Sequence, residues 1–209
     1  MIDAHAGRAV HTFDVLGVYL HTPLPDDKVV LMKFEGKFVD IMCEVNPEYE
    51  KFVIYKKGKK VLYVLILKAI YGMIESALLW YDLFSTILSD LRFKLEPYEL
   101  CIENKFIDEH QCNIGWFVDN SKISHMDDNI NSMIDDKIKG KFGNLSHTTG
   151  KMHTFLGMDI NFIGGKKVTL STPHHVDEAL EYFGETLKGN VANPITFATL
   201  HHHQRSKGT

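Results

Sequence analysis

Residues 111–124 read Gln-Cys-Asn-Ile-Gly-Trp-Phe-Val-Asp-Asn-Ser-Lys-Ile-Ser and carry the pattern that decides the fold. Apolar and β-prone residues run up to Val118, the polar pair Asp119-Asn120 follows, and a short strand is expected at 122–124. Asp and Asn favour turns because their side chains hydrogen-bond to nearby backbone groups. The stretch therefore predicts two strands joined by a tight turn, with Asp119 at its tip.

Hairpin signals recur along the chain on both sides of this stretch. Gly164-Gly165 separates two β-rich runs, and a two-residue glycine turn is a strong hairpin signal. Apolar residues at helical spacing predict helices over 74–91 and 129–142. The expected strands lie in the first half of 8–20 and at 29–34, 52–55, 61–67, 100–107, 111–118, 122–124, 153–163 and 166–171. This order predicts an α+β fold with an antiparallel sheet backed by helices.

Composition favours a folded domain. The chain has 209 residues, of which 44% are hydrophobic and 24% charged. Its longest apolar run, residues 61–67, is far shorter than the roughly 20 residues that a membrane-spanning helix needs. No signal peptide is visible, so we expect a cytoplasmic or other intracellular protein with no membrane partner.

Charge and metal-ligand patterns narrow the classes of function. The net charge of −4 is mild evidence against a protein that grips nucleic acid mainly through charge. Three cysteines without a Cys-x-x-Cys pair argue against a disulfide framework or a cysteine zinc site. The twelve histidines show no spacing typical of zinc ligands, so the sequence predicts no structural zinc site.

Two acidic residues lie within apolar strands, Asp14 after Phe13 and Asp119 after Val118. A carboxylate at a buried strand end is costly unless it is paired or binds a cation. On adjacent strands, the two would form a site for a hard divalent metal. The alternative is that Asp119-Asn120 is simply a good turn dipeptide.

Four blocks of sequence, in order, resemble a copia-type retrotransposon reverse transcriptase, an RNA-dependent DNA polymerase. The resemblance covers about residues 8–190. The blocks are Phe13-Asp14-Val15 through Tyr19-Leu20-His21, Ala69-Ile70-Tyr71-Gly72 through Trp80-Tyr81, Trp116-Phe117-Val118-Asp119, and Phe155-Leu156-Gly157-Met158-Asp159-Ile160.

The resemblance implies a polymerase palm and a catalytic group made of Asp14, Asp119 and Asn120. Asp14 and Asp119 match the metal-binding acids, which implies two Mg²⁺ or Mn²⁺ ions with a bound nucleotide. The implied partners are an RNA or DNA template with its primer and deoxynucleoside triphosphates. The oligomeric state stays open.

The family's nucleotide-binding positions match Tyr19, Tyr71, Gly72, Phe117 and Val118. Tyr19 matches the aromatic ring that lies under the incoming sugar, where it would clash with a 2′ hydroxyl. Its alternative role is that of a core tyrosine. Gly72 would let the backbone approach the nucleotide and template.

The resemblance also implies a division of the chain. Residues 1–163 match the palm, in which Phe155, Leu156 and Gly157 match the hairpin that supports the primer end. Residues 164–190 are expected to form a strand and a helix leading toward a thumb or connection. A flexible polar tail is expected at 191–209.

Departures from the family pattern predict a truncated, partly degenerate copy with weak or no activity. Asn120 replaces the second acid of the usual Tyr-x-Asp-Asp turn, and Phe117 replaces its tyrosine. Only thirteen residues precede Asp14, so the family's fingers are expected to be largely missing. Two alternatives remain, a non-catalytic nucleic-acid or protein interaction module and a non-functional transposon remnant.

Overall fold

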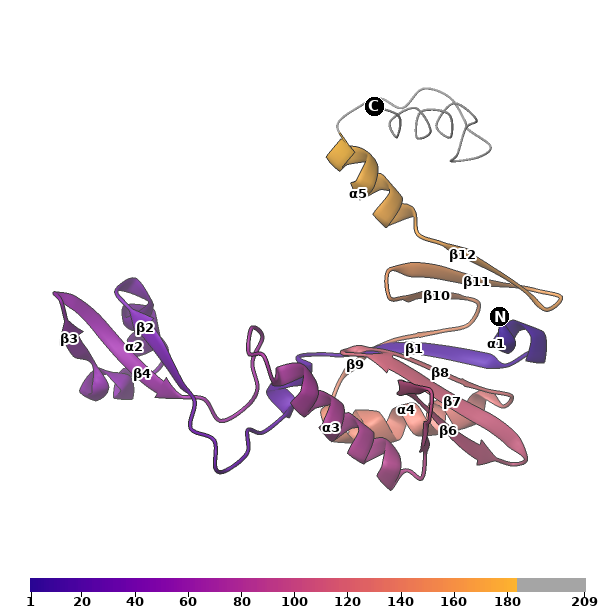
Figure 1. The fold of residues 1–209 in the computed structure, drawn as a ribbon, viewed down its shortest axis with the longest axis horizontal. Coiled ribbons are helices and arrows are strands. Elements are labelled where there is room, and N and C mark those ends of the chain that lie inside the picture. The colour runs from indigo at the N-terminus through magenta and orange to yellow at the C-terminus, as the bar shows by residue number, and fades with distance from the viewer. Residues whose placement is uncertain (184–209) are drawn as a thin grey trace, which may run out of the picture. The chain divides into compact units, whose positions relative to one another are not determined.

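A computed structural model describes residues 1–183 of the chain (Figure 1). Its centre is a six-stranded antiparallel sheet with the strand order β5-β6-β7-β8-β1-β9. The strands are β1 (Ala9–Val15), β5 (Lys94–Glu96), β6 (Glu99–Ile107), β7 (His110–Phe117), β8 (Asn120–His125) and β9 (Leu145–Thr149). The predicted α+β class is confirmed, and the strands at 100–107 and 111–118 are the adjacent strands β6 and β7.

Two helices, α3 (Ser76–Asp90) and α4 (Asp128–Phe142), pack on one face of this sheet (Figure 1). Alternate residues of β7, such as Ile114 and Trp116, are buried against them. Trp80 and Phe84 of α3 stack in the same core, with ring centroids 5.3 Å apart. The opposite face of the sheet is therefore free to carry polar side chains.

A second antiparallel sheet joins β10 (Met152–Phe155), β11 (Met158–Gly164) and β12 (Lys167–Ser171). The expectation of one continuous strand over 153–163 is wrong, because the chain turns at Leu156-Gly157. Both turn residues have positive φ, 52° and 72°, as a tight two-residue hairpin turn requires. The hairpin at Gly164-Gly165 is confirmed.

A third sheet, of strand order β2-β4-β3, lies between β1 and α3 in the sequence. Its strands are β2 (Leu31–Glu35), β3 (Ile54–Lys56) and β4 (Lys59–Leu65). Helix α2 (Lys37–Val45) and the 3₁₀ helix η2 (Pro47–Phe52) connect β2 to β3. The hairpin predicted on either side of Gly58 is confirmed, and α2 was not predicted.

The remaining elements are the short helix α1 (Ile2–Ala6), the 3₁₀ helix η1 (Val18–His21) and helix α5 (Pro173–Phe183). Met1–Ser171 form one compact unit, and α5 belongs to a second unit that begins at Thr172. The expected tail at 191–209 and the end of the 164–190 segment lie outside the described residues. Within those residues, no helix is long and apolar enough to cross a membrane.

Candidate active site

The register of the central sheet places four residues in one row across neighbouring strands. Asp14 on β1 lies opposite Asn120 on β8 and opposite Ser146 on β9. Phe117, at the end of β7, lies opposite Asn120. Directly opposed residues of antiparallel strands share a face. Phe117, Asn120, Asp14 and Ser146 therefore lie on the face away from α3 and α4, since Phe13 points into the core.

The turn between β7 and β8 holds Asp119 beside Asp14. The backbone N–H of Val15 donates to the carbonyl of Asp119 at 3.1 Å, which joins the turn to the end of β1. Val118 adopts a φ of 54°, an unfavourable conformation for a β-branched residue. Strain of this kind persists where the surrounding structure enforces it, often at functional sites.

Trp80 of α3 supports this turn from the helical face. Its indole Nε1–H donates to the carbonyl of Val118 at 2.7 Å, and its side chain is 1% exposed. A buried carbonyl without such a donor would cost free energy. Trp80 therefore couples the packing of α3 to the backbone conformation at Val118.

Asp14 and Asp119 share an electrostatic environment that disfavours two negative charges. Partial burial, and then the charge of Asp119, raise the pKa of Asp14 above its ordinary value. The Asn120 side-chain amide donates to Asp119 Oδ1 at 3.0 Å. Within residues 1–183, no lysine, arginine or histidine forms an ion pair with either carboxylate. Among the described residues, the site therefore carries negative charge without a protein cation to balance it.

Two tyrosines lie near this acidic pair. Tyr19 of η1 packs edge to face against Tyr71, with ring centroids 4.7 Å apart. Burial raises the pKa of Tyr19, and Tyr71 and the charge of Asp119 raise it further. The Tyr19 hydroxyl therefore lies close enough to the acidic turn to interact with its charge. Gly72 follows Tyr71 with a φ of 91°, a conformation that L-residues rarely adopt.

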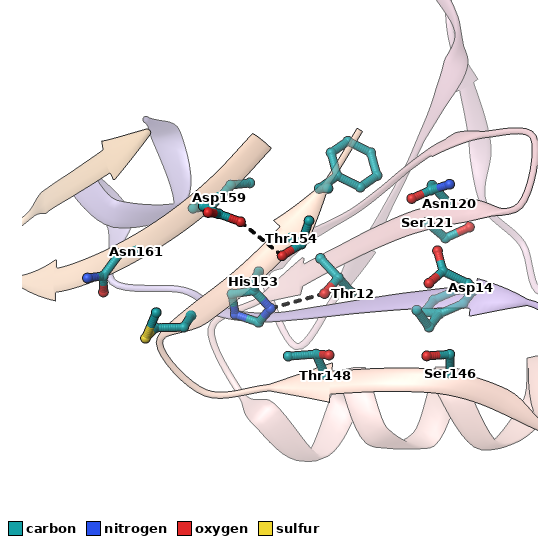
Figure 2. A pocket seen from close by; sticks show the side chains of 14 residues that line it. Thr12, Asp14, Asn120, Ser121, Ser146, Thr148, His153, Thr154, Asp159 and Asn161 are labelled. Carbon is teal, nitrogen blue, oxygen red and sulfur yellow. Dashed lines mark hydrogen bonds between the residues drawn. The ribbon is translucent and has the colours of Figure 1, made fainter. Parts of the chain in front are cut away.

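A cavity of about 270 Å³ opens beside Asp14, between the central sheet and the β10–β11 hairpin (Figure 2). Figure 2 shows Asp14 and Asn120 side by side along it, on neighbouring strands. Phe155 also lines this cavity. Asp119, Leu156 and Gly157 are not among its lining residues: Asp119 lies in the β7–β8 turn, and Leu156-Gly157 form the tip of the hairpin.

Several polar residues of this cavity were not predicted. Thr12 lies two residues before Asp14 on β1, and its hydroxyl lies 3.2 Å from His153 Nδ1. His153 Nε2–H donates to the carbonyl of Gly150 at 3.0 Å, so Nδ1 is the acceptor for Thr12. Burial lowers the pKa of His153, which favours its neutral form. Strand alternation could have found Thr12, whereas no local pattern marked His153.

The donor set of the acidic pair suits a hard divalent cation. Two carboxylates and one amide offer oxygen ligands of the type that Mg²⁺ and Mn²⁺ prefer. A cation between Asp14 and Asp119 would also offset the repulsion that raises the pKa of Asp14. The residues present therefore fit such an ion.

The solved structures that resemble this chain do so weakly. Two structures of apo telomerase from Candida tropicalis, one of them truncated from its C-terminal domain, resemble the chain with a TM-score of 0.43 each. They share 16% and 14% sequence identity over 78% of this chain. The chain spans about a third of the length of those telomerase chains. A comparison with curated proteins finds no match.

A family model described as reverse transcriptase (RNA-dependent DNA polymerase) matches residues 1–197, which is nearly the whole chain. The match includes all four sequence blocks and both acidic residues of the site. The chain therefore belongs to the reverse transcriptase (RNA-dependent DNA polymerase) family.

Proposed function

We propose that this chain is the palm of a copia-type retrotransposon reverse transcriptase, with Asp14 and Asp119 as the acids of the nucleotidyl-transfer site. The observation that carries the proposal is the geometry that sets the Asp119 turn beside Asp14: the Val15 N–H donates to the Asp119 carbonyl at 3.1 Å, and Asn120 lies directly opposite Asp14. Two carboxylates with no protein cation between them form a site that gains from binding a divalent ion.

The residues of the site would divide the work of nucleotide addition. Asp14 and Asp119 would hold two divalent ions, which supply charge neutralisation at the triphosphate and activation of the primer's 3′ hydroxyl. Tyr19, held by its contact with Tyr71, would lie under the deoxyribose and exclude a 2′ hydroxyl. Phe155, on the far side of the cavity, would contact the primer end.

Asn120 is the site residue that departs most from the family pattern. It lies directly opposite Asp14 in the sheet, at the position where the family has the second acid of the turn. An amide oxygen coordinates Mg²⁺ less strongly than a carboxylate because it carries no net charge. We therefore expect weak polymerase activity, or none, from the chain as it stands.

The same observation favours a second candidate, a palm that binds a primer–template duplex without extending it. Loss of one acid lowers cation affinity, whereas the fold and the open sheet face stay intact. Binding through phosphate contacts would weaken steeply as the salt concentration rises. Absence of both extension and duplex binding would leave the interpretation of a non-functional remnant.

Primer extension on an RNA template tests the proposal. The full chain, Asn120→Asp and Asp119→Asn are compared with Mg²⁺ and with Mn²⁺. We expect Asn120→Asp to extend the primer faster than the unsubstituted chain, and Asp119→Asn to extend it not at all. Extension that survives in Asp119→Asn would contradict the proposed site. An unsubstituted chain as fast as an intact polymerase would contradict the role given to Asn120.

A further inference from the structure

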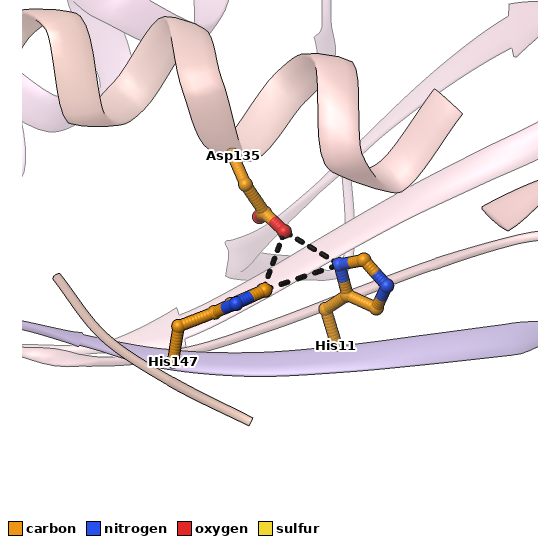
Figure 3. A group of neighbouring side chains, drawn as sticks. All are labelled: His11, Asp135 and His147. Carbon is orange, nitrogen blue, oxygen red and sulfur yellow. Dashed lines mark hydrogen bonds and ion pairs between the residues drawn. The ribbon is translucent and has the colours of Figure 1, made fainter. Parts of the chain in front are cut away.

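A second cluster of metal-ligating side chains lies on the other face of the central sheet (Figure 3). It joins His11 of β1, Asp135 of α4 and His147 of β9. Asp135 Oδ2 lies 2.5 Å from His11 Nδ1 and 2.8 Å from His147 Nε2. The two ring nitrogens lie 3.3 Å apart. Three ligand atoms from three separate elements thus converge on one point.

The sheet register separates this cluster from the candidate active site. His147 lies opposite Phe13, whose side chain points into the helical core. His11 is two residues before Phe13 and shares its face, whereas Asp14 faces the cavity. Figure 3 shows Asp135 reaching from its helix toward the two rings. The cluster therefore joins α4 to β1 and β9 and is not part of the Asp14–Asp119 site.

A neutral His11 cannot donate a hydrogen bond to both of the carboxylates beside its ring. Its side chain is 1% exposed, and both of its ring nitrogens face carboxylates. Nδ1 meets Asp135, and Nε2 lies 2.8 Å from Asp128 Oδ1. A neutral imidazole has only one N–H, so two donated hydrogen bonds would require a buried imidazolium.

The two carboxylate oxygens of Asp135 are unequally satisfied, with two neighbours at one oxygen and none at the other among the described residues. His11 and His147 both direct a ring nitrogen at the same oxygen, Oδ2. The other oxygen, Oδ1, is buried and has no hydrogen-bond partner among the described residues. The Asp135 side chain is only 8% exposed, so water does little to satisfy it. A buried acceptor without a partner costs free energy, which calls for a ligand at this position.

A metal ion would satisfy both residues. Neutral His11 would bind it through Nδ1 and donate its Nε2–H to Asp128. A carboxylate that accepts from the second nitrogen of a ligating histidine is a common feature of zinc sites. Asp135 would bind through Oδ2, with Oδ1 close enough to act as a second oxygen ligand.

We propose that His11, Asp135 and His147 bind one Zn²⁺ or a similar divalent transition-metal ion that fastens α4 to the central sheet. Two imidazoles with one carboxylate favour such ions over Mg²⁺, which prefers oxygen ligands. Ligand atoms in a tetrahedral zinc site lie about 3.3 Å apart when the bonds are about 2.0 Å. The histidine nitrogens already have this separation, and the contacts to Asp135 would open by less than about 1 Å. The His147 side chain is 36% exposed, so solvent can supply a fourth ligand.

The test uses the full chain and Co²⁺, whose visible absorption reports its coordination. Other histidines are first removed, because residues 201–203 and the pair His174 and His175 can bind metal on their own. In this chain with five histidines replaced by alanine, we expect the visible absorption of one four-coordinate Co²⁺ per protein and its loss when Zn²⁺ displaces the Co²⁺. Absence of this absorption when a micromolar protein sample is titrated past one equivalent of Co²⁺ would overturn the proposal, because metal sites of regulatory affinity are occupied at about micromolar concentrations.

Single substitutions in that background identify the ligands. His147→Ala removes a partly exposed ligand and should weaken Co²⁺ binding at least about 100-fold, more than the roughly 10–100-fold expected for Asp128→Ala, an outer partner. Asp136→Ala is the matched control, since this acid is exposed on α4 next to Asp135, and it should bind Co²⁺ normally. Asp14→Asn should also bind normally, which separates this site from the proposed polymerase site. Equal affinity in His147→Ala and the control would overturn the assignment, and circular dichroism shows whether each variant is folded.

Discussion

Partial burial, and then the negative charge of Asp119, raise the pKa of Asp14, although 105 positions separate the two residues in the chain. The link is the hydrogen bond from the Val15 N–H to the Asp119 carbonyl, together with the pairing of Asp14 with Asn120 across β1 and β8. The fold thus keeps two carboxylates together at a cost in stability. That cost is the physical basis of the first prediction.

Asp14→Asn should stabilise the metal-free protein at pH 7. The pKa of Asp14 is raised in the folded state by burial and then by Asp119. The protonated carboxyl is therefore favoured on folding, and stability is lost as the pH rises through the folded-state pKa. The substitution should raise the free energy of unfolding at neutral pH, and this gain should vanish below the ordinary pKa of 3.8. Urea unfolding measures the effect, with Asp136→Asn as the control. A loss of stability at pH 7 would contradict it.

Trp80→Phe should destabilise the fold by about 1–3 kcal/mol beyond its matched control, because the partly buried Val118 carbonyl loses its donor. Trp116→Phe is that control: Trp116 is also buried, at 3% exposed, and makes no such hydrogen bond among the described residues. Hydrogen exchange at the β7–β8 turn should accelerate in Trp80→Phe only. Similar effects of the two substitutions would show that Trp80 acts through its volume alone.

Much of this architecture could be predicted because its signals are local. The apolar run to Val118 followed by Asp119-Asn120 identified the β7–β8 hairpin, and helical periodicity identified α3 and α4. The pattern of apolar residues missed the turn at Leu156-Gly157, since one of its two positive-φ positions is a leucine, whereas the family resemblance implied a hairpin there. Helix α2 was missed as well: Phe38, Ile41, Met42 and Val45 follow helical spacing, but the pattern extends over only nine residues.

The second-face cluster could not be predicted for a different reason. Its three members lie at positions 11, 135 and 147, so no spacing within a motif connects them. Only the pairing of β1 with β9 and the packing of α4 bring them together. Asp14 and Asp119 are also far apart in sequence, but each lies within an apolar strand, and the family resemblance connected their two blocks.

Asn120→Asp should increase the affinity for Mg²⁺ at least tenfold. A unit negative charge about 4 Å from a divalent ion contributes about 2 kcal/mol even in water. Calorimetric titration with Mg²⁺ measures the change. Asn161→Asp is the control, because it adds the same charge to the same cavity from β11, away from Asp119. An equal increase of Mg²⁺ affinity in both variants would contradict coordination by residue 120, because it would show that the added negative charge in the cavity is sufficient.

Tyr19 should control the choice between deoxynucleotides and ribonucleotides. Tyr19→Phe keeps the ring that packs against Tyr71 and should keep the preference for deoxynucleoside triphosphates. Tyr19→Ala removes the ring and should reduce that preference at least tenfold. A tenfold change requires the loss of only ~1.4 kcal/mol of steric repulsion against the 2′ hydroxyl. Competition binding of the two nucleotide classes in Asn120→Asp measures it. An unchanged preference in Tyr19→Ala would contradict a role in nucleotide selection and would leave Tyr19 as a core tyrosine.

Binding of Mn²⁺ in the presence of a deoxynucleoside triphosphate, followed by electron paramagnetic resonance, tests the central claim most directly. The measurement uses the His147→Ala chain that also lacks the histidines at 174, 175 and 201–203, so that neither the proposed zinc site nor these histidines contribute. Asp14→Asn and Asp119→Asn should each weaken the protein-dependent binding at least tenfold, about 1.4 kcal/mol, while Asp136→Asn should not change it. Equal Mn²⁺ binding by the parent chain, Asp14→Asn and Asp119→Asn would contradict the assignment of these two acids as the metal site of a polymerase palm.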